Sequence, residues 1–187
     1  MSKLEEDECY VWMALRRVSP NKNENTGLTK KSYRFVQSSN DTNLDMINML
    51  HNVINIQEGS WRMYRTVNKR SFTKARKQLL IDLINMPEIF TSKIGSHWKS
   101  ILMKSGTKVE RNFLFDFDSN DSNIEQLFRT YLLSQKDCTI IDEFKTPNGR
   151  HFVTNPFYWK EGKEFNFHGT VIELKKDALV YIGSVIN

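Results

Sequence analysis

The sequence has little cysteine and no long apolar run. Only two of its 187 residues are cysteines, Cys9 and Cys138, so one disulfide is possible, but a disulfide framework and a cysteine-rich zinc module are both excluded. No apolar stretch approaches the roughly 20 residues that cross a bilayer, and the mean hydropathy is −0.54. Residues 5–8 are acidic, whereas a secretory signal begins with a basic segment. We therefore expect a reduced, intracellular, cytoplasmic protein without membrane contact.

The composition is that of a globular protein with a mildly basic charge. Hydrophobic residues make up 39% and charged residues 26%, which excludes a predominantly disordered chain. The sequence has no internal repeat and no low-complexity linker, so its length predicts a single domain over residues 1–187, with residues 1–8 disordered. The net charge of +5 is compatible with binding to nucleic acid or nucleotides, and equally with a basic protein that binds neither.

The pattern of apolar residues predicts an α+β fold. Strands are expected over residues 9–17, 31–37, 61–67, 111–118, 139–144, 151–157, 170–174 and 179–186. Helices are expected over residues 39–56, after Ser71, over residues 92–104 and after Asn120 or Asp121. Asp41 is the expected N-cap of the first helix, and residues 19–30 are expected to form a loop. Strands and helices alternate early and strands dominate late, which favours one mixed domain.

Two carboxylates end the most apolar of these strands, FLFDFD at residues 113–118. Asp116 and Asp118 share one face, because alternate strand residues point the same way, and Phe115 and Phe117 share the other. Two ionised carboxylates about 7 Å apart repel each other unless a cation lies between them. Oxygen ligands favour Mg²⁺ or Mn²⁺, and paired metals of this kind recur in phosphoryl transfer. The alternative is that one aspartate faces solvent and the other caps the next helix.

A tight turn precedes the next candidate residues. Thr-Pro-Asn-Gly at residues 146–149 is a strong turn signal, and it delivers Arg150 and His151 to the start of a strand. Two such donors beside a turn suit a phosphate chain. The simpler interpretation is a solvated loop end.

Basic residues are interleaved with aromatic ones over residues 61–70, WRMYRTVNKR. This pattern matches faces that bind nucleic acid or nucleotides, and a helix N-terminus at Ser71 would add backbone amides for phosphate. A strand with one solvated basic face explains the same pattern. Asp177 lies between two late strands, where a turn residue is expected.

The order of these motifs resembles the archaeo-eukaryotic primase superfamily, which includes the primase-polymerases, in its minimal viral and phage members. VNKR at residues 67–70 is followed by the DxD of Asp116 and Asp118, then by Gly-x-His at residues 149–151, then by Asp177. The DxD matches the family's first motif, and the Gly-x-His resembles its Ser-x-His motif with glycine in place of serine. Residues 64–75 resemble the early Y-x-x-x-N-x-R region. The resemblance covers about residues 60–182.

The resemblance implies a catalytic core with an RRM-like sheet, flanking helices and a smaller α/β unit. It implies that Mg²⁺ or Mn²⁺ ions are held by Asp116, Asp118 and Asp177. It also implies that His151, helped by Arg150, contacts the phosphates of a nucleoside triphosphate. Phosphates of the nucleotide or of a single-stranded template would be bound by three basic residues, Arg65, Lys69 and Arg70. The implied reaction is that of a DNA primase, attack of a 3′ hydroxyl on an α-phosphate.

The same resemblance implies partners and alternatives. A helicase or another replication protein would be needed as a partner, and a viral protein would work in the host cytoplasm. One departure is that Asp177 follows two lysines, whereas the family's third acidic motif follows an apolar run. A metal-dependent nuclease or phosphotransferase could use the same carboxylates, and a non-catalytic nucleic-acid-binding module could keep the fold alone. A covalent nucleotidyl-lysine ligase is disfavoured, because the sequence has no KxDG motif.

Overall fold

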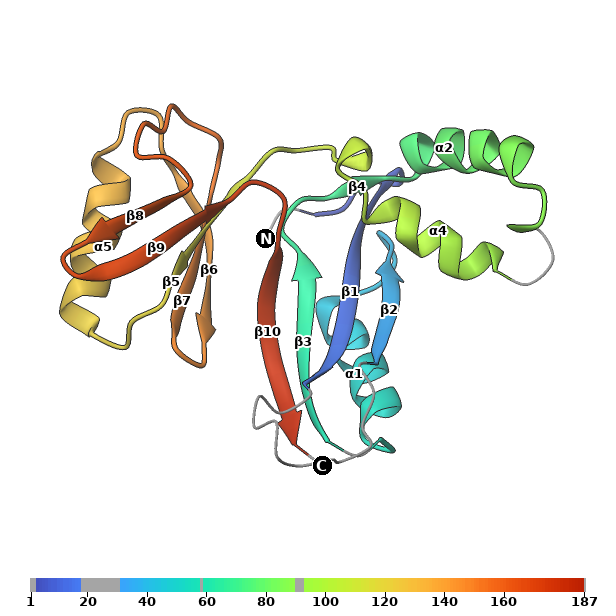
Figure 1. Ribbon diagram of the computed structural model, residues 1–187, viewed down its shortest axis with the longest axis horizontal. Coiled ribbons are helices and arrows are strands. Elements are labelled where there is room, and N and C mark those ends of the chain that lie inside the picture. The colour runs from blue at the N-terminus through green and yellow to red at the C-terminus, as the bar shows by residue number, and fades with distance from the viewer. Residues whose placement is uncertain (1–2, 18–30, 58, 90–92, 187) are drawn as a thin grey trace. The chain divides into compact units, whose positions relative to one another are not determined.

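The computed structural model describes residues 3–17, 31–57, 59–89 and 93–186. Over these residues the chain is an α+β protein with antiparallel sheets (Figure 1), which confirms the predicted fold class at this level. Its contacts divide the chain into two compact units. The C-terminal unit comprises Thr66–Asn68 and Glu110–Ile182, and the N-terminal unit comprises Lys3–Arg65, Lys69–Val109 and the residues from Gly183 onward. Whether the two units fold together as one domain is not decided by this division, so the single domain over residues 1–187 stays a prediction.

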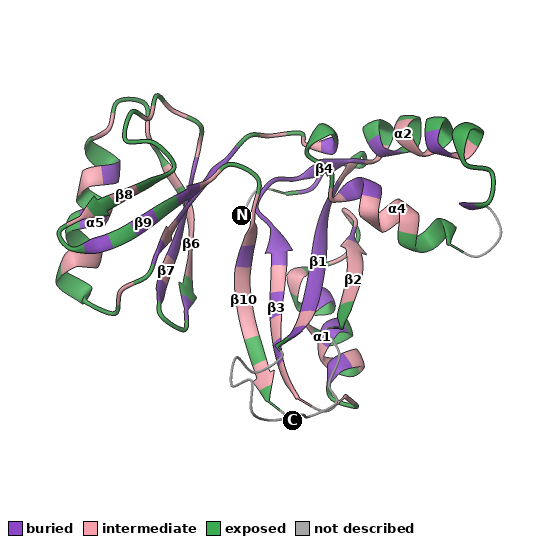
Figure 2. Ribbon diagram, viewed as in Figure 1, coloured by how far each residue is buried: buried purple, intermediate pink, exposed green. Residues whose placement is uncertain are grey.

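The N-terminal unit is built on a sheet with the strand order β10–β3–β1–β2, in which β4 also pairs with β1. Its elements are β1 (Glu8–Arg17), β2 (Ser32–Gln37), α1 (Asn43–Ile54), β3 (Ser60–Thr66), β4 (Arg70–Ser71), α2 (Phe72–Asn85), α4 (Ile94–Leu102), the 3-10 turn η1 (Ser105–Thr107) and the end of β10 (Leu179–Ile186). β1 is buried along most of its length, as its purple colour in Figure 2 shows. The helices α2 and α4 pack together against Cys9 and Val11 of this strand.

Local hydrogen bonds set where the helices of this unit begin. The prediction of Asp41 as the first N-cap is wrong, because its carboxylate accepts from the N–H and hydroxyl of Ser38. The N-cap of α1 is Thr42, whose hydroxyl accepts from the N–H of Asp45, and the Asp45 carboxylate accepts from the Thr42 N–H in return. Ser71 caps α2 as predicted.

The prediction of disorder over residues 1–8 is wrong for residues 3–8. Leu4 is 8% exposed and Glu8 begins β1. The Asp7 carboxylate accepts from the Ser71 hydroxyl at 2.6 Å and from the Thr73 N–H at 2.8 Å, so a negative charge lies at the start of α2. Residues 1–2 and the predicted loop over 19–30 lie outside the described residues.

The C-terminal unit is built on a sheet with the strand order β6–β7–β5–β9–β8, and every neighbouring pair is antiparallel. Its elements are β5 (Phe113–Phe117), α5 (Ser122–Ser134), β6 (Ile140–Thr146), β7 (Gly149–Thr154), β8 (Glu164–Phe167) and β9 (Thr170–Lys175). α5 connects β5 to β6 while β7 lies between them, which makes a split β–α–β arrangement. Within this unit, the sequence pattern did not predict β8, a strand of four residues in which Phe165 and Phe167 alternate with polar residues.

The two faces of this sheet differ. The face toward α5 is a core rich in aromatic rings, in which Phe115, Phe117 and Phe128 are fully buried. The Phe115 and Phe128 rings meet edge to face with centroids 5.9 Å apart, and the Phe117 and Phe128 rings stack at 5.7 Å. The opposite face holds a smaller apolar cluster around Leu114 and Val153. The rest of that second face is therefore open to polar residues.

Cys9 and Cys138 are free thiols. Burial raises the pKa of Cys9 to about 12 and that of Cys138 to about 11, so neither thiol is ionised at neutral pH. Within the described residues, no helix has both the length and the apolar character that a membrane span needs.

Gly149 is required by a close approach between β7 and the end of β5. A Cβ at this position would overlap the backbone oxygen of Phe117 and crowd backbone atoms of Ser119. The serine that the family motif carries here could be accommodated only if the backbone moved, because the obstacles are main-chain atoms.

We expect Gly149→Ala to lower the free energy of unfolding by about 1–3 kcal/mol, as for other overpacked sites. Urea unfolding of the full chain measures the change. The matched control is Gly106→Ala, because a Cβ at Gly106 meets no atom within 4 Å, and its effect should stay within about 0.5 kcal/mol. Equal effects of the two substitutions would contradict the close approach.

Candidate functional site

A row of polar residues crosses the second face of the C-terminal sheet. Asp116 on β5 lies opposite His151 on β7 and opposite Glu173 on β9. Asp118 follows at the end of β5 and shares the face of Asp116, because alternate strand residues point the same way. Asp118 and Glu173 are exposed, whereas His151 is buried. Three strands therefore bring carboxylates and an imidazole together at one end of the sheet.

His151 is held between Asp116 and the backbone of β10. Its Nε2 lies 3.2 Å from Oδ1 of Asp116, and its Nδ1 accepts a hydrogen bond of 3.2 Å from the N–H of Tyr181. Because Nδ1 is an acceptor, the proton of the neutral ring is on Nε2 and points to Asp116. The residue is 7% exposed. Both ring nitrogens of His151 thus have partners inside the protein.

Lys175 supplies the positive charge of this face. Its Nζ donates to Oδ2 of Asp116 at 2.6 Å and lies 3.1 Å from Oε2 of Glu173. The register of β9 places Lys175 opposite Leu114, so it shares the face of Glu173, two residues before it. One ammonium group therefore pairs with two carboxylates and offsets part of their negative charge, a role that a bound metal ion could also fill.

The two aspartates differ in their electrostatic surroundings. Burial alone would raise the pKa of Asp116, but hydrogen bonds from His151 and Lys175 outweigh burial and lower the pKa to about 2. The pKa of Asp118 is raised, first by partial burial and then by the charge of Asp116. Burial would lower the pKa of Lys175, but its bonds to Asp116 and Glu173 raise that pKa above its usual value. Neighbouring carboxyls with pKa values moved in opposite directions are typical of functional sites.

The metal-ligand set implied by the resemblance is only partly assembled. Asp116 and Asp118 are on one face, and Asp177 lies exposed in the bend between β9 and β10. Over residues 3–17, 31–57, 59–89 and 93–186, no three His, Cys, Asp or Glu side chains are grouped closely enough to hold a metal ion. The structure therefore brings together the aspartate pair and His151, and does not group Asp177 with them.

Arg150 lies on the face opposite to His151, because consecutive strand residues point to opposite sides. Its Nε donates to Oε1 of Glu125 on α5 at 2.8 Å, and its Nη1 lies 3.5 Å from Oε2 of Glu143. Glu143 also pairs with Arg129 at 2.5 Å. These ion pairs attach α5 to β6 and β7, so the structure places Arg150 in the packing of the helix and away from the carboxylate row.

The three basic candidates from the early region belong to the N-terminal unit and are at least nine-tenths buried. Arg65 lies over the rings of Tyr10 and Trp12, with Cζ 4.2 Å and 5.9 Å from their centroids. Lys69 pairs with Glu8 at 2.8 Å. The Arg70 Nη1 donates to the backbone oxygen of Lys104 at 3.3 Å. Each of these cations has a partner inside the N-terminal unit, whereas the carboxylate row belongs to the C-terminal unit.

Sequence reasoning missed three members of the site, namely Glu173, Lys175 and the N–H of Tyr181. The alternation of Glu173 and Lys175 with the buried Ile172 and Leu174 was a signal that both face the same way. Nothing in the sequence shows that they face Asp116, because that depends on the pairing of β5 with β9.

Comparison of the chain with protein-family models, with curated proteins and with solved structures finds no match.

The lowered pKa of Asp116 predicts a specific pH dependence of stability. In the unfolded chain the carboxyl titrates near 3.8, and in the folded chain near 2. Its contribution of about 2 kcal/mol is therefore present above about pH 4 and is lost as the pH falls toward 2. We expect the difference in unfolding free energy between the native chain and Asp116→Asn to shrink over this range, as measured by urea unfolding at stepped pH. A difference that stays constant from pH 5 to the lowest accessible pH would contradict this assignment.

Proposed function

We propose that this chain is a metal-dependent nucleotidyltransferase of the primase-polymerase kind, which adds nucleotides to a 3′ hydroxyl on a single-stranded template. The observation that carries the proposal is the pair of aspartates at the end of β5, of which Asp116 is fixed by His151 and Lys175 while Asp118 remains exposed. A fixed carboxylate beside an open one suits a site that must hold a cation and admit a substrate.

The topology of the C-terminal unit supports the proposal of an RRM-like sheet. In an RRM-like sheet, a split β–α–β unit places its first strand at the centre of the sheet. Here β5 is that first strand, α5 connects it to β6, and β7 lies between β5 and β6. β9 adds to the other side of β5, as a further antiparallel strand. The aspartates thus lie on a central strand, where neighbours on both sides fix their positions.

The donor chemistry of the carboxylate row fits Mg²⁺ or Mn²⁺. Asp116 and Asp118 would hold the ion, and the exposed Glu173 lies opposite Asp116 as a further oxygen donor. A bound divalent ion lowers the pKa of an attacking hydroxyl and stabilises charge on the entering and leaving oxygens. His151 keeps its Nε2 proton directed at Asp116 and so fixes the carboxylate, which is a positioning role like that of other outer-shell residues.

A second function is favoured by Lys175. Its ammonium group already forms ion pairs with Asp116 and Glu173, and the described residues contain no group of three metal ligands. A protein with this arrangement could be a non-catalytic nucleic-acid-binding module, in which the carboxylate row is a structural ion-pair network. The two functions differ in a simple respect, since only the enzyme binds a divalent ion at this face.

The enzyme proposal predicts metal-dependent primer extension by the full chain. With Mn²⁺, nucleoside triphosphates and a labelled primer on a longer single-stranded template, we expect extension, and we expect the Asp116→Asn, Asp118→Asn double variant to lose it by about 100-fold or more. The reason is that metal stabilisation of the reaction is worth several kcal/mol, and each 1.4 kcal/mol is tenfold in rate. Gel analysis of product length over time measures the rate.

The matched control for this experiment is Asp137→Asn. Asp137 has a positive φ of 63°, which asparagine also tolerates, and it lies exposed in the turn before β6, away from the row. Thermal unfolding checks that all variants are folded. Full extension by the double variant would refute the site, and shortening of the oligonucleotide without triphosphates would show a nuclease instead.

Lys175 provides a test that separates the two functions. If a divalent ion binds at this face, Lys175→Gln removes a competing cation and should tighten Mn²⁺ binding by roughly tenfold, a value discounted for the partial exposure of the lysine. Lys176→Gln is the control, because it removes the same charge from the next residue, whose Nζ lies 5.5 Å from the ring centroid of Phe113. Calorimetric titration with MnCl₂ measures both. Absence of Mn²⁺ binding in the native chain and in both variants would favour the non-catalytic module.

A further inference from the structure

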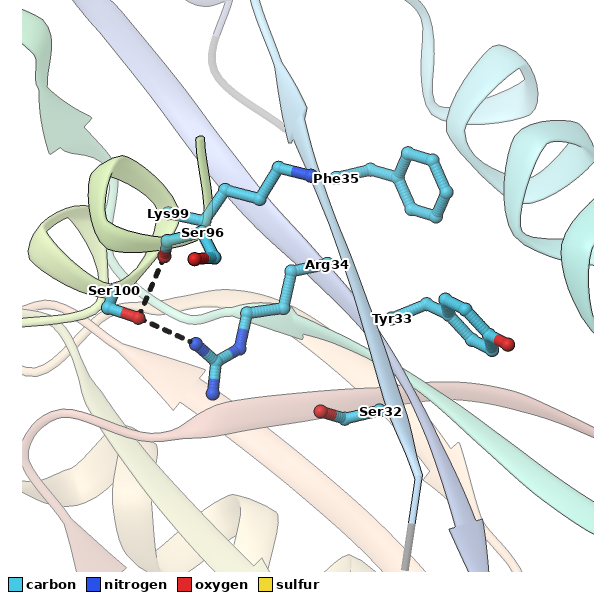
Figure 3. Close-up of a pocket in the computed structure, with 7 residues that line it drawn as sticks. All are labelled: Ser32, Tyr33, Arg34, Phe35, Ser96, Lys99 and Ser100. Atoms are coloured by element: carbon cyan, nitrogen blue, oxygen red, sulfur yellow. Dashed lines mark hydrogen bonds between the residues drawn. The ribbon is translucent and has the colours of Figure 1, made fainter. Parts of the chain in front are cut away.

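A polar pocket lies within the N-terminal unit, between the edge strand β2 and the helix α4. It has a volume of about 380 Å³ and is lined by Ser32, Tyr33, Arg34, Phe35, Ser96, Lys99 and Ser100. Figure 3 shows the Arg34 and Ser32 side chains on the α4 side of β2, and the rings of Tyr33 and Phe35 on the other side. The side chains that face the helix are thus an arginine and a serine, and the helix contributes two serines and a lysine.

The Arg34 side chain is held by a hydrogen bond from one of its nitrogens, and another N–H group of its guanidinium has no partner among the described residues. Its Nη1 donates to the Ser100 hydroxyl at 3.1 Å, and that hydroxyl donates to the backbone oxygen of Ser96 at 2.9 Å (Figure 3). Its Nε is shut off from solvent and has no hydrogen-bond partner among the described residues. A buried N–H without a partner costs about 1–3 kcal/mol. The guanidinium is therefore held in one orientation while part of its hydrogen-bonding capacity remains unused.

Within residues 3–17, 31–57, 59–89 and 93–186, no acidic side chain compensates the positive charge of the pocket. Lys99 is half-buried, and its Nζ lies 5.8 Å from the centroid of the Phe35 ring. In the part of the chain that the structure describes, neither Arg34 nor Lys99 forms a salt bridge, and no acidic residue lines the pocket. The hydroxyls of Ser96 and Ser100 already donate to backbone oxygens. Two cations around one cavity whose described lining has no carboxylate favour an anionic ligand.

We propose that this pocket binds a phosphoryl group, either of a small phosphate compound or of a nucleic-acid strand. A phosphoryl group offers at least two acceptor oxygens at once, and it can accept from an arginine and an ammonium group together. The pocket is larger than a bare phosphate needs, so it has room for a phosphate that carries a substituent. None of its lining residues belongs to the carboxylate row, and the proposal does not depend on the enzyme function.

The test is calorimetric titration of the full chain in EDTA, which removes any divalent ion that could bind phosphate at the carboxylate row. Three probes are used: inorganic phosphate, an eight-residue oligothymidylate with a 5′ phosphate, and the same oligomer with a 5′ hydroxyl. We expect at least one probe to bind, and we expect Arg34→Gln and Lys99→Gln each to weaken it by about tenfold or more, as for lost charged hydrogen bonds. Binding of inorganic phosphate alone would indicate that the ligand is a small anion. Tighter binding of the oligomer with a 5′ phosphate would indicate the end of a strand. Equal binding of the two oligomers would indicate the backbone of a strand.

The control is Lys77→Gln, which removes one positive charge from an exposed position on α2 outside the pocket and should leave binding within about twofold, as expected of a distant exposed charge. Arg34→Lys is added because it keeps the charge but loses the fork, and it should retain only part of the affinity. Thermal unfolding shows whether each variant is folded. Absence of binding by all three probes, or equal weakening by Lys77→Gln and Lys99→Gln, would overturn the proposal.

Discussion

The alternation of β5 is the constraint on which the candidate site depends. Phe115 and Phe117 are fully buried against Phe128 of α5, and burial of each aromatic side chain is worth about 1.5–3 kcal/mol. A slip of the strand by one residue would expose both rings and move Asp116 and Asp118 into the aromatic core, where an unpaired charge costs several kcal/mol. The aromatic residues and the aspartates therefore specify the same orientation, each for its own reason.

With the orientation of β5 fixed, the properties of the site depend on the charges around the two aspartates. Asp116 is half-buried and stays ionised because His151 and Lys175 both donate to it, whereas Asp118 lies at the strand end with a raised pKa. The hydrogen bonds from His151 and Lys175 together outweigh the effect of burial and lower the pKa of Asp116. The ion pair of Lys175 with Asp116 makes the carboxylate row stable as a protein structure, so the geometry alone is compatible with an enzyme and with a binding module.

Much of the fold could be predicted from the sequence, because strand and helix periodicity, turn residues and capping residues act over short distances. The shared face of Asp116 and Asp118 is of this kind. The position of His151 opposite Asp116 depends on the pairing of β5 with β7, which no local pattern determines. Arg65 illustrates the opposite failure: its spacing suggested a nucleic-acid face, but the rings of Tyr10 and Trp12 on the neighbouring strand cover it. Burial of a charge depends on neighbours that are distant in the sequence.

The hydrogen bond from the backbone N–H of Tyr181 to His151 also links the site to the strand that connects the two units. Tyr181 lies in β10, a strand whose first residues belong to the C-terminal unit and whose last residues belong to the N-terminal unit. The proton position of the imidazole is thus governed by a main-chain atom of the segment that passes from one unit into the other. A shift of β10 along its own axis by a single residue would withdraw that N–H from Nδ1 and leave the ring held through Nε2 by Asp116. The segment that connects the two units thus also determines which ring nitrogen of His151 carries the proton.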